Sequence, residues 1–273
     1  MIGIDIGSYS IKAVELQKNE GSSKITNIRF HERARQDDLP SVLNKFFADA
    51  KFFLKDVNIS VSGHLTLARV LDFPRMSDDE LKGAVKFEAE KFMPFGVEDA
   101  IINYHVISRD AASKKITVLL AAARRDLISR YIDIISGAGY TVNAVDIDGI
   151  AVTNAFFYSQ KEAGDKIFAL LNIGDSVSSF SIAQNGTPYL LRDIAGCGAD
   201  ISDAIAKGLN IELPEAYRIK HATPPEKAQN ISELIRPVLN RFIKEINLSV
   251  GYYENQFLKG VEALYVSGGS SRL

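Results

Sequence analysis

The chain has 273 residues, of which 46% are hydrophobic and 24% charged, and its formal net charge is -2. Such a chain buries a sizeable core, and its interspersed acidic and basic residues argue against a general electrostatic grip on nucleic acid. One cysteine, Cys197, cannot form an intramolecular disulfide, and no apolar run reaches the roughly 18 to 20 residues that span a bilayer, so we expect a cytoplasmic protein.

The chain opens with a pattern typical of a β-hairpin with a tight loop. An apolar run ends in Asp5-Ile6-Gly7, and an alternating segment follows over residues 10–16. Gly7 permits close approach of the backbone to an anion, and the hydroxyls of Ser8 and Ser10 add donors. This arrangement predicts a phosphate-binding loop, although Asp-x-Gly-Ser also occurs in many structural turns.

Charged side chains flank this loop, which also contains Tyr9. Lys12 would supply positive charge to a phosphate. Asp5, at the end of the first strand, would hold waters of a phosphate-bound Mg²⁺, because magnesium keeps most of its hydration shell.

The following segment alternates strand and helix signals. Strands are predicted over 57–62, 68–73, 101–108, 116–123 and 140–145, and helices over 77–93 and 126–138. Ser77 and Glu80 predict a capping box at the start of the first helix, which Pro94 ends. Residues 74–145 are therefore expected to form a small inserted α+β subdomain.

Two acidic residues, Asp146 and Asp148, follow the last of these strands. If a nucleotide is hydrolysed, either carboxylate is a candidate for orienting water near the γ-phosphate. The alternative, and the more frequent role of such residues, is to cap a helix that begins near Gly149.

A second segment repeats the opening layout about 167 residues further on, a distance that suggests domain duplication and not a solenoid. An apolar run over 168–171 ends in Asn172-Ile173-Gly174, and Asp175 and Ser176 precede an alternating strand over 178–182. Two facing loops of this kind can clamp one polyphosphate between domains.

The rest of the chain is predicted to be mainly helical before a final strand. Helices are expected over 200–209 and 231–258, with a kink or a start at Pro237, and a loop over 221–230 because of Pro224-Pro225. A strand over 263–267 leads into Gly268-Gly269-Ser270, where a glycine pair lets a flat adenosine approach the backbone.

These three elements in this order resemble the actin, sugar kinase and chaperone ATPase superfamily, with two phosphate motifs and an adenosine motif. The resemblance implies an α/β protein with the actin-like ATPase fold: two related ribonuclease-H-like halves, with the α+β subdomain inserted in the first. The first half would comprise 1–73 and 146–162, and the second 163–273, with a helical subdomain over about 212–260. ATP and Mg²⁺ are the implied cofactors, with Asp5 and Asp175 holding the metal through water.

The segment over 191–205 looks like the one that follows the second phosphate motif, and the one over 215–220 looks like the base-contacting helix of the FtsA branch. By that resemblance Glu215 and Lys220 contact adenine or ribose. The alternative is that both belong to a solvated helix face.

Within the superfamily, the stretches 87–99 and 235–253 resemble the PilM family of type IV pilus systems. The resemblance implies an ATP-binding cytoplasmic adaptor of the inner-membrane pilus assembly platform, which reaches the membrane only through its partner. It would dock the N-terminal cytoplasmic peptide of a PilN-like bitopic protein in a groove formed with the inserted subdomain, with Phe87, Glu90 and Phe95 as candidates. Other platform or motor components and a second copy of the chain are further candidate partners.

Two departures from the family matter. Asn172 stands where an aspartate is usual, and Asp175 only partly substitutes for it, so we expect slow or absent ATP hydrolysis. The chain also ends at Leu273, directly after the adenosine motif, where this fold ordinarily continues. That ending points to truncation or to a short natural protein.

Two other functions fit the superfamily. A small-molecule kinase would use the interdomain cleft for phosphoryl transfer, but sugar kinases are generally much longer, and no convincing substrate-binding acid is visible. A filament-forming, FtsA-like cell division protein would ordinarily carry a C-terminal amphipathic membrane helix, which is not visible in this sequence.

The remaining distinctive residues have structural interpretations. Cys197, between two glycines, is expected to provide small packing and not a nucleophile. The pairs Phe46-Phe47 and Phe52-Phe53 are expected to fill the core beneath the first sheet, although an exposed pair would mark a partner surface.

Overall fold

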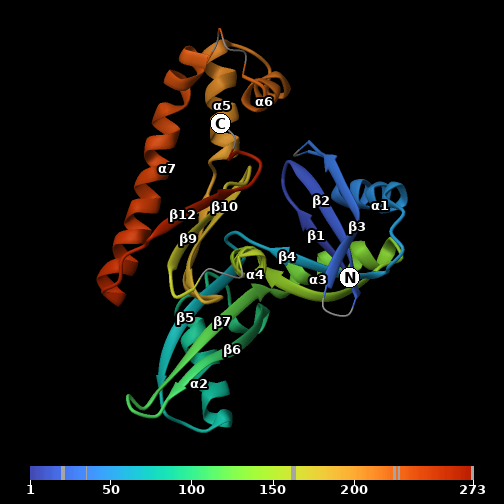
Figure 1. Ribbon diagram of the computed structural model, residues 1–273. Helices are drawn as coiled ribbons and strands as arrows, with labels where there is room; N and C mark the ends of the chain where they lie inside the picture. The colour runs from blue at the N-terminus through green and yellow to red at the C-terminus, as the bar shows by residue number, and fades with distance from the viewer. Residues whose placement is uncertain (20–21, 35, 161–163, 224–225, 227, 272–273) are drawn as a thin grey trace. The chain divides into compact units, whose positions relative to one another are not determined.

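The computed structural model describes residues 1–19, 22–34, 36–160, 164–223, 226 and 228–271. The chain forms two units, Met1–Ala151 and Val152–Leu273 (Figure 1). No helix in the described part of the chain is both long enough and apolar enough to cross a membrane.

The first unit is built on a five-stranded sheet in the order β3-β2-β1-β4-β8. Its strands are β1 (Ile2–Ile6), β2 (Ser10–Asn19), β3 (Ser22–Glu32), β4 (Asp56–Val61) and β8 (Thr141–Ile147). The first three pair antiparallel, and β4 and β8 continue the sheet in parallel with β1. The C-terminal ends of β1, β4 and β8 therefore meet at one edge of the sheet.

Two helices, α1 (Leu39–Ala50) and α3 (Arg125–Gly137), contribute to the core of this unit. Phe46, Phe47 and Phe52 are buried as predicted, and the ring of Tyr140 stacks on that of Phe47 with centroids 4.2 Å apart. The prediction was wrong for Phe53, whose side chain is 87% exposed.

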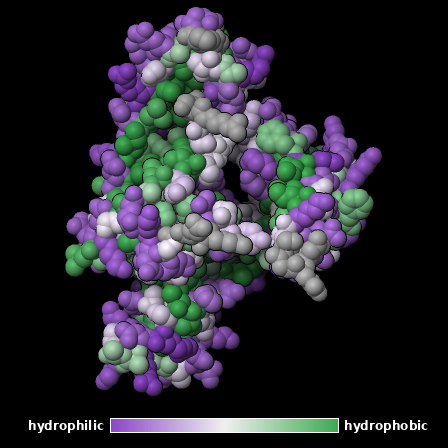
Figure 2. Space-filling view, in the orientation of Figure 1, coloured by the Kyte–Doolittle hydropathy of each residue, from purple (hydrophilic) through white to green (hydrophobic). Residues whose placement is uncertain are grey.

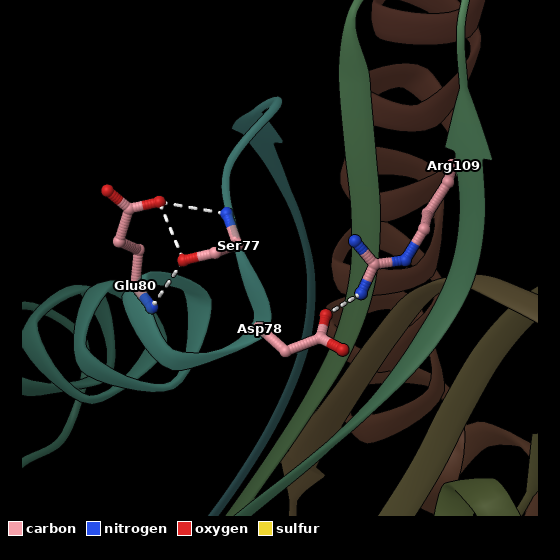
Figure 3. A network of polar contacts seen from close by, with 4 residues as sticks. All are labelled: Ser77, Asp78, Glu80 and Arg109. Atoms are coloured by element: carbon pink, nitrogen blue, oxygen red, sulfur yellow. Dashed lines mark hydrogen bonds and ion pairs between the residues drawn. The ribbon is translucent and has the colours of Figure 1, made fainter.

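The inserted subdomain is a three-stranded sheet in the order β5-β7-β6, and α2 packs against it (Figure 1). Its elements are β5 (Thr66–Pro74), α2 (Asp78–Glu90), the short η1 (Val97–Asp99), β6 (Ala100–Asp110) and β7 (Lys115–Arg124). The predicted capping box is present: the Glu80 N–H donates to Ser77 Oγ, and the Ser77 N–H donates to the Glu80 carboxylate (Figure 3). An ion pair between Arg109 of β6 and Asp78 joins the start of α2 to the sheet (Figure 3).

The boundaries of this subdomain differ from the expected 74–145. Strand β5 pairs with β7 along its whole length, so the inserted sheet begins at Thr66. Helix α3 and strand β8 belong to the first sheet, because β8 pairs in parallel with β4. The helix α4 (Asp148–Ser159) also departs from the expected division, since its residues from Val152 onward group with the second unit.

The second unit repeats the strand arrangement of the first. Its four-stranded sheet has the order β11-β10-β9-β12, with an antiparallel hairpin and a parallel neighbour, as in β3-β2-β1-β4. The strands are β9 (Ile167–Asn172), β10 (Val177–Gln184), β11 (Thr187–Ala195) and β12 (Ala263–Ser267). This equivalence confirms the predicted relation between the two halves.

In the described residues after β11, the second unit contains the helices α5 (Gly198–Leu209), α6 (Leu213–His221) and α7 (Ala228–Phe257). Pro237 lies inside α7, so of the two predicted outcomes, a kink or a start, the helix does not start there. Residues 228–230 are helical as well, which shortens the expected loop, and Pro224-Pro225 lie outside the described residues. The apolar side of α7 packs with α5 and the sheet through residues that include Ile235, Phe242 and Tyr253.

Candidate functional site

The loop between β1 and β2 has the tight geometry predicted for the first phosphate motif. The Gly7 N–H donates to the Ser10 carbonyl at 3.0 Å. A methyl group at Gly7 would lie 2.9 Å from that carbonyl oxygen, so the turn requires glycine. Ser8 and Tyr9 form the turn itself, and Ser10 is buried at the start of β2.

The two charged residues of this loop contact one another. Asp5 and Lys12 are directly opposite each other on β1 and β2, and Lys12 Nζ lies 2.7 Å from Asp5 Oδ2. Both side chains are about half exposed. The structure thus brings together the predicted phosphate cation and the predicted magnesium carboxylate, and each neutralises the other.

The two candidate catalytic acids lie at the same edge of the sheet as the first loop. Asp146 is near the end of β8, and Asp148 is the first residue of α4. Burial raises the pKa of the Asp146 carboxyl, the Ile147 N–H that donates to it opposes the increase, and the charge of Asp148 adds to it. A carboxylate in the first turn of a helix is stabilised there, which fits the structural alternative for Asp148.

The second predicted phosphate loop joins β9 to β10. Asn172 ends β9, and the Ile173 N–H donates to the Ser267 carbonyl at 2.8 Å. A methyl group at Gly174 would lie 2.1 Å from the Val177 carbonyl oxygen, so this turn also requires glycine. Asp175 Oδ1 accepts a hydrogen bond from the Tyr217 hydroxyl at 2.8 Å.

The predicted adenosine motif packs directly on this loop. Gly268 has a φ of 97°, and a side chain there would lie 2.4 Å from the Ile173 carbonyl oxygen. The Ser270 N–H donates to the same carbonyl at 3.3 Å, and the Ser267 hydroxyl lies 3.4 Å from Asn172 Oδ1. At the next residue, Gly269, an added Cβ would meet no atom of the described residues within 4 Å, its chain neighbours aside.

The start of α5 joins the same cluster. The Gly198 N–H donates to the Gly174 carbonyl at 3.1 Å, and the Ala199 N–H donates to the Asp175 carbonyl at 2.8 Å. Within the second unit, the structure therefore brings together the loop from Asn172 to Ser176, the glycine pair after β12 and the N-terminus of α5.

The two residues of helix α6 that were predicted to contact nucleotide, Lys220 and Glu215, lie in different surroundings. Lys220 is buried, and its ammonium donates to the Gly198 carbonyl at 3.0 Å and lies 4.6 Å from the centre of the Tyr217 ring. Glu215 forms an ion pair with Arg218 at 2.5 Å. The residue of α6 that contacts the second loop is Tyr217, which sequence reasoning missed; its spacing of three from Lys220 is the signal that was available.

The residues suggested for a partner groove lie on or just after α2. Phe87 is 64% exposed with the Lys91 ammonium 5.0 Å from its ring centre, Glu90 is exposed, and Phe95 is half-buried. The opposite side of α2 packs in the core of the subdomain through Leu81 and Val85. Figure 2 shows hydrophobic patches interrupting the hydrophilic surface of this subdomain, at the bottom of the view.

Cys197 lies immediately before α5 and is almost fully buried. Burial, with a contribution from Asp200, raises the pKa of its thiol to about 11. A buried thiol that remains protonated is a poor nucleophile, so the packing role fits the structure. Among the described residues, no group of three or more His, Cys, Asp or Glu is arranged to hold a metal ion directly.

A family model described as type IV pilus assembly protein PilM matches residues 3–273. A solved PilM-PilN type IV pilus biogenesis complex is similar with a TM-score of 0.87 and 22% identity over 99% of this chain and 82% of that one. Ethanolamine utilization protein EutJ from Carboxydothermus hydrogenoformans is similar with a TM-score of 0.57 and 15% identity over 100% and 77%. The fold is the actin-like ATPase fold, as predicted.

Proposed function

Because this chain belongs to the PilM family of type IV pilus assembly proteins, we propose that it is the ATP-binding cytoplasmic adaptor of the inner-membrane pilus platform. The observation that carries the nucleotide proposal is the packing of three backbone segments around Gly198. The second loop, the glycine pair after β12 and the start of α5 meet there, with contacts that leave no room for a side chain at Gly198 or Gly268.

The loops hold the nucleotide in this proposal. The backbone of Gly174, Asp175 and Ser176 contacts phosphate, and Gly268 and Gly269 let adenosine lie against the backbone. An open approach to Gly269 supports that role, because no atom lies within 4 Å of the position a side chain would take.

The first loop contributes Ser8, Ser10 and Lys12 to phosphate binding, and Asp5, with Asp175, orders waters of Mg²⁺. Lys12 is paired with Asp5, so a bound nucleotide competes with Asp5 for the ammonium while the metal takes over the carboxylate. Lys12 would then pair with phosphate and Asp5 with the hydrated metal, so neither side chain would lose its oppositely charged partner.

The partner is proposed to be the N-terminal cytoplasmic peptide of a PilN-like bitopic protein. Support comes from the similar solved structure, which is named a PilM-PilN complex, and from the exposed Phe87 on α2. The groove is proposed to include Phe87, Glu90 and Phe95, and the protein reaches the membrane through this partner. ATP alters the affinity for the peptide if the two ligands favour the same arrangement of the halves.

Mg-ATP titration calorimetry tests the proposal with the parent, Lys12→Ala, and Lys24→Ala as a control on an exposed lysine of β3 outside the loop. Lys12→Ala removes the cation proposed to contact the phosphates, so ATP affinity should fall by about tenfold or more, and Lys24→Ala should bind like the parent. A second titration adds a PilN-like N-terminal peptide. No ATP binding by the parent would contradict the nucleotide proposal and leave at most a peptide-binding scaffold.

A further inference from the structure

The first phosphate loop is held by a second cation, Arg33, which the sequence motif does not include. Arg33 directly follows β3 and contacts the loop twice. Its backbone N–H donates to the Tyr9 carbonyl at 2.9 Å, and its Nη1 reaches the Gly7 carbonyl at 3.5 Å. Both contacts are to backbone carbonyl oxygens of the loop, and neither involves a side chain of the loop.

One donor of the Arg33 guanidinium makes no hydrogen bond within the described residues. Its Nε is buried and has no hydrogen-bond partner, and no carboxylate in the described part of the chain forms an ion pair with it. Lys12, on the same loop, is in contrast paired with Asp5 at 2.7 Å. A buried donor without a partner is unfavourable, so its retention beside a loop that requires glycine calls for a functional reason.

The contact at Gly7 fixes the direction of the next amide. Across a trans peptide bond, the C=O of one residue and the N–H of the next point to opposite sides, and the described chain has no cis peptide bond. When Arg33 holds the Gly7 carbonyl, the Ser8 N–H is turned away from the guanidinium. An ordered amide of this kind is what a loop needs to bind an anion.

We propose that Arg33 is a positioning residue for phosphate binding, which acts by holding the Gly7–Ser8 peptide in the orientation that presents the Ser8 amide. The inference rests on the proposed nucleotide-binding function and assigns Arg33 to the polyphosphate part of the ligand. Its positive charge favours the same anion through the loop. Arg33 is not proposed to contact the base or the ribose. Its substitution should therefore lower the affinity for ATP and ADP and leave the affinity for adenosine unchanged.

The test measures affinities for ATP, ADP and adenosine in the full chain, together with the urea unfolding midpoint. Arg33→Gln and Arg33→Ala should weaken ATP and ADP binding by about tenfold while adenosine affinity stays within about twofold. Arg33→Lys, which keeps the charge and one flexible donor, should recover part of the loss. The matched control is Arg29→Gln, at an exposed arginine of β3 whose guanidinium donates to the neighbouring Ile28 carbonyl.

Unchanged ATP affinity in Arg33→Ala would overturn the inference, and so would an equal loss of adenosine affinity, which indicates general damage to the fold. Failure of the proposed function can be distinguished from failure of the inference about Arg33. If the parent binds no ATP, the proposed function fails and the inference fails with it. If the parent binds ATP and the Arg33 variants bind equally well, only the role of Arg33 is wrong.

Discussion

Substitution of Gly198 by alanine tests whether the second loop, the glycine pair and α5 pack as one unit. A methyl group there would lie 2.5 Å from Ser270 Oγ, 2.6 Å from the Gly174 carbonyl oxygen and 2.9 Å from the Asp175 Cα. The Ser270 side chain can rotate away, but the other two atoms belong to the backbone of the loop. Relief therefore requires the loop or α5 to move, and overpacking of this kind costs about 1–3 kcal/mol.

The assay is urea unfolding of Gly198→Ala beside Gly251→Ala, each compared with the parent. Gly251 lies inside α7, and a methyl group there would contact nothing within 4 Å. Alanine is a better helix former than glycine by about 1 kcal/mol, so Gly251→Ala should raise the free energy of unfolding while Gly198→Ala lowers it. The same substitution thus has opposite signs at the two sites.

ATP titration of the same variants separates packing from binding. Displacement of Gly174 and Asp175 should weaken ATP binding in Gly198→Ala, whereas Gly251→Ala should bind ATP like the parent. A Gly198→Ala protein at least as stable as the parent would refute the packing described at α5. A destabilised variant with parental ATP affinity would show that this junction is structural and does not shape the nucleotide site.

Two further predictions concern buried polar groups. Glu15 is 1% exposed, and its carboxylate accepts hydrogen bonds from the N–H groups of Phe53 and Leu54 at 2.8 and 2.9 Å. Glu15→Ala should therefore lower the free energy of unfolding by about 2–5 kcal/mol. A loss below about 0.5 kcal/mol, measured by urea titration, would contradict this prediction. The Cys197 thiol is buried and has a pKa of about 11, so only about 0.1% of it is thiolate at pH 8. A disulfide reagent should therefore label Cys197 only after the protein unfolds. Rapid labelling of the native protein would contradict its burial.

Local sequence signals predicted the elements whose causes are local. The two hairpins, the strand before Gly268 and the capping box at Ser77 depend on residues within a few positions of one another, and the structure contains all of them. Strand β3 was not predicted, and its register explains why. A shift between Glu15 and Leu16 pairs Ile25 with Leu16 and Ile28 with Val14, so apolar residues three apart lie on one face and the alternation of a strand is lost.

Membership of a sheet could not be predicted, because it depends on pairing between distant segments. Nothing in the alternation of β5 tells whether it pairs with β4 or with β7, which lies about 50 residues further along the chain. Lys220 illustrates the same limit at the site. The family resemblance implied that Lys220 contacts adenine or ribose, with a solvated helix face as the alternative. Its ammonium is buried against the Gly198 carbonyl, a partner 22 positions away that local sequence could not identify.

The surroundings of the acids in the candidate site agree with the proposal of a protein that binds a nucleotide and hydrolyses it slowly or not at all. Asp5 is paired with Lys12, Asp175 accepts from Tyr217, and burial raises the pKa of Asp146. At the end of β9, the second loop begins with the neutral Asn172. Under the proposed function, Mg²⁺ would draw Asp5 from its lysine or Asp175 from its tyrosine, and either exchange would move a side chain that contacts a loop. The proposal therefore predicts that metal and nucleotide binding are coupled to loop structure.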